Sequence, residues 1–405
     1  MSSPCPAREA NPARASLRWF LALALVSALL NSSAPTPLYP HYQQTLALSS
    51  VSLTLIYGGY AGGVLLSLLG VGNLAGRVRD LRVMIVPALM AVAGGALLFA
   101  LANSFWSLLI ARVLAGIGTG ALTGAANVAL LRFGPDDGGK RAALSATLSF
   151  TLGLALGPIF SALALQLGIY PTLLPFMLIM LMALCAMVGV TLYWPDRARE
   201  GAPTLSGQPL GTLRQGLAAT GGAFFLCAGA LFTARVAAAS LLAIGPNVAR
   251  ELLGMTDLGL FGYLVAAYLL VSGLCQLWCR RLDARHTLLS GCLALALCLL
   301  LFLMAVHWQR LGLALFGFLV AGYAQGAIFV GSATLVNRIA PRASHARLVS
   351  LFYVIAYLAN WVPVLLGWVS DHAGVGRAMD LLCLGGALAS LWLAWRIQAR
   401  AFHHG

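Results

Sequence analysis

Two arginines stand alone inside long apolar stretches, and they are the residues best suited to hold an anion in this chain. Arg235 lies within the run Ala-Leu-Phe-Thr-Ala-Arg-Val-Ala-Ala-Ala, and Arg112 lies in a similar run nearer one end of its stretch. A guanidinium inside an apolar helix is costly, so it normally faces a cavity or a partner. For Arg235 two interpretations stay open: an anion-binding or gating residue in a central cavity, or a structural group that binds backbone carbonyls of a neighbouring helix.

Tyrosine and amide side chains form a second candidate set. Tyr353, Tyr357 and Asn360 lie about one helical turn apart, so a helix would place them on one face. Aromatic rings with hydroxyl and amide groups suit a tolerant pocket for planar organic molecules. The other members of this set, each with ordinary helix packing as its alternative, are Tyr57, Tyr60, Tyr263, Tyr268, Tyr323, Gln325, Asn337 and Trp361.

A polar segment with two prolines interrupts the first apolar stretch at residues 31–37. Irregular backbone inside a membrane is tolerated where it lines a cavity. Asn31 is therefore a further candidate for substrate binding, with a simple helix kink as the alternative.

Acidic residues are few, and all 11 lie in loops or at the ends of the apolar stretches. Proton-driven carriers commonly use a carboxylate deep in the membrane, because its charge can be neutralised and released on alternate sides. The placement of the acidic residues in this chain argues against proton coupling. It does not exclude such coupling, because acids at helix ends can also be hydrated and coupled to transport.

Sequence signatures of catalysis are absent from the chain. It has no H-E-x-x-H, no phosphate-binding G-x-x-x-x-G-K-[ST], and no convincing pair of nucleophile and base. The eight cysteines have no paired spacing and mostly lie in apolar runs, as small packing residues do. We expect no enzyme, no ATP-driven pump, no metal site and no cofactor.

The elements that must position these residues are long apolar helices. The chain is 60% hydrophobic and only 9% charged, with a mean hydropathy of +0.89. Runs of about 20 apolar residues are long enough to cross a bilayer as helices. We expect an all-α integral membrane protein with twelve spans, at 19–40, 50–72, 83–102, 105–131, 142–167, 171–194, 216–245, 257–279, 286–306, 310–336, 347–369 and 378–396.

The distribution of basic residues predicts the orientation of these spans. A net charge of +14 could indicate nucleic-acid binding, but 20 of the 25 basic residues lie on one side of the predicted membrane. Cytoplasmic loops carry such an excess, so both termini are expected in the cytoplasm of a bacterial-type cell, with the protein in its inner membrane. A cleaved signal peptide at the start is the alternative, but its loss would break the even number of spans.

A charged string occurs twice, about half the chain apart. Arg77, Asp80 and Arg82 are repeated in type and spacing by Arg280, Asp283 and Arg285. Two similar membrane halves are typical of transporters, in which two bundles rock about a shared central site. We expect an N-terminal bundle at 1–194, a cytoplasmic linker at 195–215 and a C-terminal bundle at 216–405.

Four motifs resemble those of the major facilitator superfamily, over essentially the whole chain. Residues 112–118 resemble its R-x-x-x-G-x-G motif, and 153–162 are similar to the antiporter motif that ends in G-P-x-x-G-G. Residues 72–80 are similar to its G-x-x-x-D-R-x-G-R loop but carry Gly76 in place of the acid. Asn31 stands where some drug exporters carry an acid.

The resemblance implies a fold of two six-helix bundles and a role in export. It associates Gly157 and Pro158 with drug/proton antiport, and Arg112 with proton transfer, although a structural role for Arg112 remains open. Asp80 with Arg77, and Asp283 with Arg280, become candidates for coupling or gating. The family architecture also implies that the spans carrying the tyrosine and amide set surround the cavity.

Three hypotheses of function remain. The first is an exporter of small drug-like compounds, coupled to proton entry. The second is an exporter or facilitator of organic anions that the membrane potential drives without proton coupling. The third is a membrane receptor or scaffold that does not transport. For the carrier, we expect a monomer in the lipid bilayer with a small-molecule substrate, a proton as candidate co-substrate, and no nucleic acid.

Overall fold

The chain folds almost entirely into helices. The computed structural model describes residues 12–71, 80–134, 140–168, 170–195, 212–255, 257–341 and 344–399, and it contains no strand within these ranges. The first half contains α1 (Pro12–Ser33), η1 (Thr36–Leu38), α2 (Tyr39–Thr45), α3 (Ser50–Val71), α4 (Arg82–Ala100), α5 (Phe105–Arg132), α6 (Lys140–Leu167) and α7 (Leu174–Tyr193). The second half contains α8 (Leu213–Thr220), α9 (Gly222–Ala243), α10 (Gly245–Glu251), α11 (Leu258–Cys279), α12 (Ala284–His307), α13 (Leu311–Ile339), α14 (His345–Leu358), η3 (Ala359–Trp361), α15 (Val362–Ala373) and α16 (Val375–Ala399).

The twelve predicted spans are confirmed. Twelve segments of the described chain are helical, long and apolar enough to cross a membrane. Two of them are broken. The first runs through α1, η1 and α2, and the eleventh runs through α14, η3 and α15. Prolines explain both breaks, because a proline lacks the N–H that would continue a helix: Pro35 and Pro37 in the first, and Pro363 in the eleventh.

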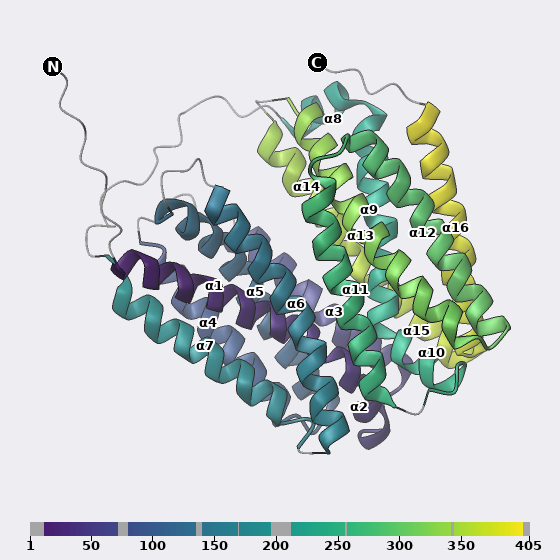
Figure 1. Ribbon diagram of the computed structural model, residues 1–405, viewed down its shortest axis with the longest axis horizontal. Coiled ribbons are helices and arrows are strands. Elements are labelled where there is room, and N and C mark those ends of the chain that lie inside the picture. Colours follow the sequence, from purple (N-terminus) through teal and green to yellow (C-terminus); the bar gives the residue numbers. More distant parts are fainter. Residues whose placement is uncertain are drawn as a thin grey trace.

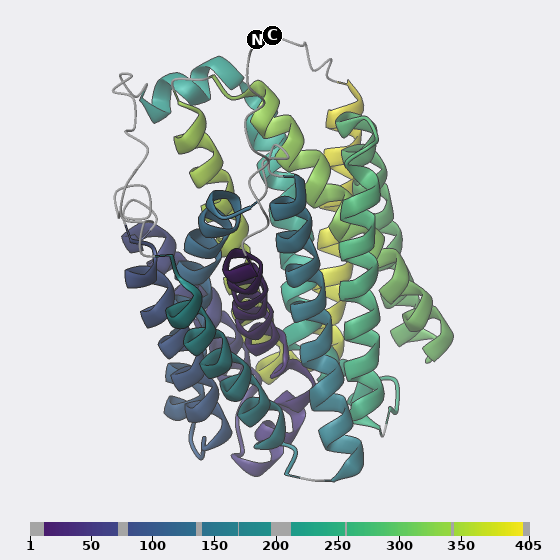
Figure 2. The same cartoon turned by 60° about the vertical axis from the view of Figure 1, so that its left-hand side comes forward.

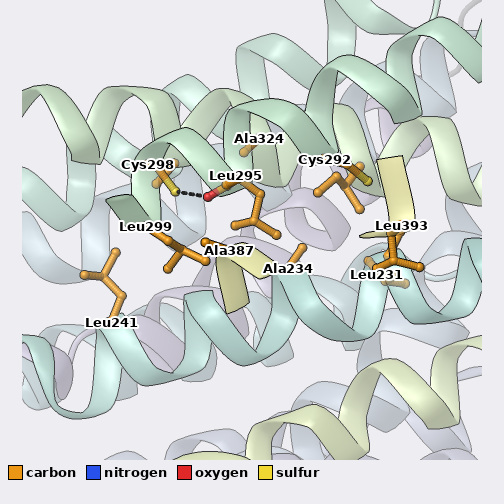
Figure 3. Packing of buried hydrophobic residues seen from close by; sticks show 14 of the residues in the cluster. Leu231, Ala234, Leu241, Cys292, Leu295, Cys298, Leu299, Ala324, Ala387 and Leu393 are labelled. Atoms are coloured by element: carbon orange, nitrogen blue, oxygen red, sulfur yellow. Dashed lines mark hydrogen bonds between the residues drawn. The ribbon is translucent and has the colours of Figure 1, made fainter. Parts of the chain in front are cut away.

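Two bundles of helices have separate apolar interiors. One cluster of buried residues comes from α1–α7, and a second comes from α9–α16. Figure 3 shows the second, where leucines and alanines of α9, α12 and α16 interlock and the thiol of Cys298 donates to the carbonyl of Leu295 at 3.1 Å. The cysteines here fill space among aliphatic side chains.

The bundles lie closest together at one end of the molecule. We call the side on which α1 begins and α16 ends the near side, and the opposite side, with α2 and α10, the far side. In Figures 1 and 2 the bundles lie against each other at the far side, and their ribbons diverge toward the near side.

The duplicated charged string caps equivalent helices in the two halves. The carboxylate of Asp80 accepts the backbone N–H of Arg82, the first residue of α4, at 3.0 Å and pairs with the Arg82 guanidinium at 2.9 Å. Asp283 accepts the backbone N–H groups of Arg285 and His286 at 3.0 Å at the start of α12. The bond from the His286 backbone contributes most to a lowered pKa of Asp283, and the bond from Arg285 adds to it. Both lower the pKa because they favour the charged carboxylate.

Part of the predicted linker is helical. Residues 213–220 form α8, which ends at Gly221 with a positive φ of 55°, so the predicted start of the second bundle at 216 falls inside this helix. Residues 196–211 and Arg77 lie outside the described residues.

Glycines allow α3 and α5 to touch backbone to backbone. A Cβ added at Gly116 would overlap the backbone of Tyr60, and one added at Gly63 would overlap the backbone of Val113. Small residues serve this purpose in membranes, where apolar burial does not drive helix association.

This packing predicts a sharp difference between two glycines of α5. Gly116→Ala should destabilise the protein by about 1–3 kcal/mol, because a methyl group would be forced against backbone that cannot move aside. Gly124→Ala is the matched control, since its Cβ would meet nothing within 4 Å. Thermal unfolding in detergent measures both, and equal midpoints for the two variants would contradict the close approach.

Candidate functional site

Arg235 is a charged group at membrane depth without a polar partner. It lies on α9, more than two turns from either end of the helix, and its side chain is half-buried. Among the described residues its guanidinium makes no hydrogen bond and no ion pair. Its nearest ring is that of Phe329 on α13, whose centroid is 5.8 Å away. The structure therefore leaves this charge without a neutralising group.

Four tyrosines, from both bundles, lie within electrostatic reach of the guanidinium. Arg235 acts electrostatically on Tyr57 of α3, Tyr268 of α11, and Tyr353 and Tyr357 of α14. Only α3 belongs to the first bundle. We call these four tyrosines, Phe329 and Arg235 the Arg235 cluster. It combines one cation, five aromatic rings and four hydroxyls, and its members come from both halves of the chain.

The break in the eleventh span lies beside this cluster. Tyr353 and Tyr357 are on one face of the last turns of α14, as the spacing predicted, and η3 follows directly. The amide of Asn360 donates to the carbonyl of Tyr357 at 3.1 Å. Asn360 therefore stabilises the backbone at the break, and a short 3-10 segment inside a span is a common place for a hinge.

Arg112 has a different environment, in the packed interior of the first bundle. Its side chain is only 2% exposed, and Nη1 donates to the carbonyl of Ser32 at 2.9 Å and that of Asn31 at 3.5 Å. These are among the last carbonyls of α1, which have no partner within the helix and form the negative end of its dipole. The guanidinium also lies over the rings of Tyr60, at 4.9 Å, and Tyr57, at 5.9 Å. Arg112 is thus bound to the broken end of α1.

Several sequence candidates lie away from the Arg235 cluster. The amide of Asn31 is buried and donates to the carbonyl of Val92 on α4 at 3.2 Å, so it links helices of the first bundle. The hydroxyl of Tyr263 bonds to Gln166 of α6 at 2.9 Å, and that of Tyr323 bonds to Ser290 of α12 at 2.8 Å. These contacts tie helices together and are not directed at a common site. Tyr60 packs on Arg112 but also interacts electrostatically with Tyr57 and Tyr357, so it lies beside the Arg235 cluster.

Gln325 lines an apolar cavity within the second bundle. The cavity has a volume of about 50 Å³, and its walls include Phe261, Phe318 and Tyr268. Tyr268 is its one residue in common with the Arg235 cluster. Within the described part of the chain, no group of three or more His, Cys, Asp or Glu side chains could hold a metal ion.

The antiporter-like segment packs the broken first span against α6. A Cβ at Gly157 would lie 2.7 Å from the carbonyl oxygen of Leu30 and 2.8 Å from the nitrogen of Ala34. Ser161, one turn after Pro158, donates to the carbonyl of Ala34 at 2.7 Å. The motif therefore supports the irregular backbone of the first span. On the near side, the Arg280 guanidinium donates to the hydroxyl of Thr147 on α6 at 3.3 Å and so touches the other bundle.

Phe329 is the member of the cluster that sequence reasoning did not single out. It follows Gln325 by one helical turn on α13, but a phenylalanine in a span is ordinary, and only the fold places its ring beside Arg235. Tyr57, Tyr268, Tyr353 and Tyr357 belong to the predicted set, and the structure places them near Arg235.

Comparison with known proteins gives one family and a set of similar folds. A model described as Major Facilitator Superfamily matches residues 21–362. A bacterial homologue of the human lysosomal transporter Spinster, in an inward-facing and unoccupied conformation, superposes with a TM-score of 0.74 at 15% identity, over 96% of this chain and 98% of that one. The nucleoside transporter NupG gives 0.74 at 14% identity, over 95% and 99%. The peptide transporter POT gives 0.75 at 15% identity, over 97% and 96%. The search of curated proteins finds no match.

The different environments of the two arginines predict different costs of removal. Arg112→Gln should lower stability by about 1–3 kcal/mol, because the buried carbonyls at the end of α1 would lose their donor. Arg235→Gln should leave stability within about 0.5 kcal/mol, because no hydrogen bond is lost. Thermal unfolding without added ligand measures the two side by side, and a large loss for Arg235→Gln would make that residue structural.

Proposed function

The chain belongs to the major facilitator superfamily and is therefore a secondary transporter, and we propose that it carries small organic anions with a planar or aromatic part. The observation that carries this proposal is the Arg235 guanidinium, which lies at membrane depth among aromatic rings and has no polar partner among the described residues. A substrate carboxylate would supply the missing charge.

The chemistry of the cluster favours such a substrate. A guanidinium binds a carboxylate through two parallel N–H donors, which fixes orientation as well as charge. Tyrosine rings offer apolar faces for a flat molecule and hydroxyls for its polar edge. The membrane interior excludes water, so each of these contacts is stronger there than in solution.

The positions of the acids support an anion over a cation. The six carboxylates of the described chain lie in loops or within two turns of a helix end, namely Asp80, Glu251, Asp257, Asp283, Asp371 and Asp380. A lipophilic cation would meet Arg235 without a nearby counter-charge.

The arrangement of the bundles supports alternating access. If the near side is cytoplasmic, as the basic loops predict, the diverging bundles of Figure 1 correspond to an inward-facing state. The substrate would then enter from the cytoplasm of a bacterial-type cell. The protein would work as a monomer and export this substrate across the inner membrane.

The membrane potential can drive this export without a proton. An inside-negative potential favours the exit of each negative charge by roughly 2.3 kcal/mol per 100 mV. A carrier of this kind needs no carboxylate at membrane depth.

Proton-coupled export of drug-like compounds is the second candidate. The packing of Gly157 and Ser161 against the first span favours it, because the segment that holds them and Pro158 resembles the antiporter motif. The solved structures with a similar fold carry names that refer to quite different cargo, nucleosides and peptides.

Binding of model substrates tests the anion proposal. Aryl carboxylates should stabilise the wild-type protein in a thermal-shift assay, and Arg235→Gln should weaken binding by at least about tenfold, the loss of roughly one charge-assisted contact. Arg235→Lys should retain part of the affinity. Tyr357→Phe should weaken binding, whereas Tyr323→Phe is the matched control, because its hydroxyl is bonded to Ser290. Stabilisation by lipophilic cations alone, unchanged in Arg235→Gln, would contradict the proposal.

Transport in sealed vesicles separates the two driving forces. With a potential set by potassium and a potassium ionophore, anion efflux should rise with the inside-negative voltage, because the anion carries net charge. Collapse of the potential should stop net export, while a pH gradient alone should have little effect. Export driven by the pH gradient at zero potential would instead favour the proton antiporter.

A further inference from the structure

A carboxylate of the second bundle caps the first helix turn of a span in the first bundle. Asp371 lies near the end of α15, on the far side. Its Oδ1 accepts the backbone N–H of Ser50 at 2.8 Å, and its Oδ2 accepts that of Val51 at 3.0 Å. Ser50 is the first residue of α3, and the first N–H groups of a helix have no partner within it. The end of α3 is therefore capped by the other half of the protein.

The surrounding contacts show that α15 and α3 pack closely against each other. Ser370 donates to the hydroxyl of Ser50 at 3.4 Å. A Cβ at Gly367 would lie 2.6 Å from the hydroxyl oxygen of Thr54 and 2.9 Å from the carbonyl oxygen of Ser50. Gly367, Ser370 and Asp371 share one face of α15, because residues three and four apart are neighbours on a helix. That face rests on α3 without a gap.

A second polar bridge crosses between the bundles on the same side. Asp257 caps α11 by accepting the backbone N–H of Gly259 at 2.8 Å, and its other oxygen accepts the side-chain amide of Gln166 on α6 at 2.9 Å. The hydroxyl of Tyr263, also on α11, donates to the amide oxygen of Gln166 at 2.9 Å. By the order of the spans in the two halves, α6 and α11 correspond to α15 and α3. The two bridges thus occupy equivalent positions in the two halves. In one, Asp257 belongs to the bundle of the helix that it caps; in the other, Asp371 caps a helix of the opposite bundle.

We propose that Asp371 is a gating residue, which closes the far side of the transporter by capping α3 across the interface between the bundles. To open the far side, α15 must leave α3, and the N–H groups of Ser50 and Val51 must exchange a carboxylate for water. The bridge through Gln166 and Asp257 must break in the same movement. The inference rests on the alternating-access part of the proposed function and not on the nature of the substrate.

Hydrogen exchange on the full-length protein in lipid nanodiscs, without substrate, tests this gate. Asp371→Ala should speed amide exchange by about three- to thirtyfold at 50–53, the range that corresponds to loss of a helix cap. Because the gate opens as a unit, exchange should also rise at 257–263 and 162–168, which form the other bridge. Asp283→Ala is the matched control: it removes a cap on the near side and should affect only the start of α12.

A second variant keeps the carboxylate and pushes the helices apart. Gly367→Ala adds a methyl group between α15 and α3 and should give the same pattern of exchange, whereas Gly385→Ala on α16 should not, since its Cβ would meet nothing within 4 Å. If Asp371→Ala does not fold, this pair decides the question. Faster exchange confined to 50–53 would make Asp371 a local cap, and unchanged exchange in both variants would overturn the gate. Neither result depends on whether the substrate is an anion.

Discussion

Every charge and every free backbone group inside an apolar bundle needs a partner, and this constraint governs the structure. Arg112 and the broken end of α1 satisfy each other, because the guanidinium donates to the carbonyls of Ser32 and Asn31. Desolvation would otherwise penalise both the cation and the carbonyls. Arg235 lies over the ring of Phe329 and has no acceptor among the described residues, so the structure leaves its charge unpaired. The arginine of the first bundle, Arg112, is hydrogen-bonded to backbone carbonyls, whereas Arg235 of the second bundle is not.

Helix ends are where the acids of this protein act. Asp80 and Asp283 cap helices of their own half at the near side, and Asp257 does the same at the far side. Asp371 instead caps a helix of the other half. A cap within one bundle is kept whichever side is open, whereas a cap between bundles exists only while they touch. A carboxylate that caps a helix of its own half therefore stabilises that half, whereas one that caps a helix of the other half takes part in gating.

Close backbone contact holds the helices of the first bundle together. Gly63 and Gly116 bring α3 and α5 into contact, and Gly157 brings α6 against the broken first span. Small residues allow this close approach in a membrane. The broken eleventh span, with η3 beside the Arg235 cluster, offers a bend between the site and the far-side junction.

The sequence alone was enough to predict the twelve spans, the repeated charged string and the position of Arg235 inside an apolar run, because span length, repeats and charge within an apolar run are local properties of the chain. It could not determine which face of each span points inward, since lipid-facing and core-facing positions are both apolar. Tertiary structure alone therefore turned Tyr323 and Tyr263 toward other helices and brought Phe329 to Arg235. It also joined Asp371 to Ser50, two residues that nothing in the spacing connects, because the contact depends on how two distant spans meet.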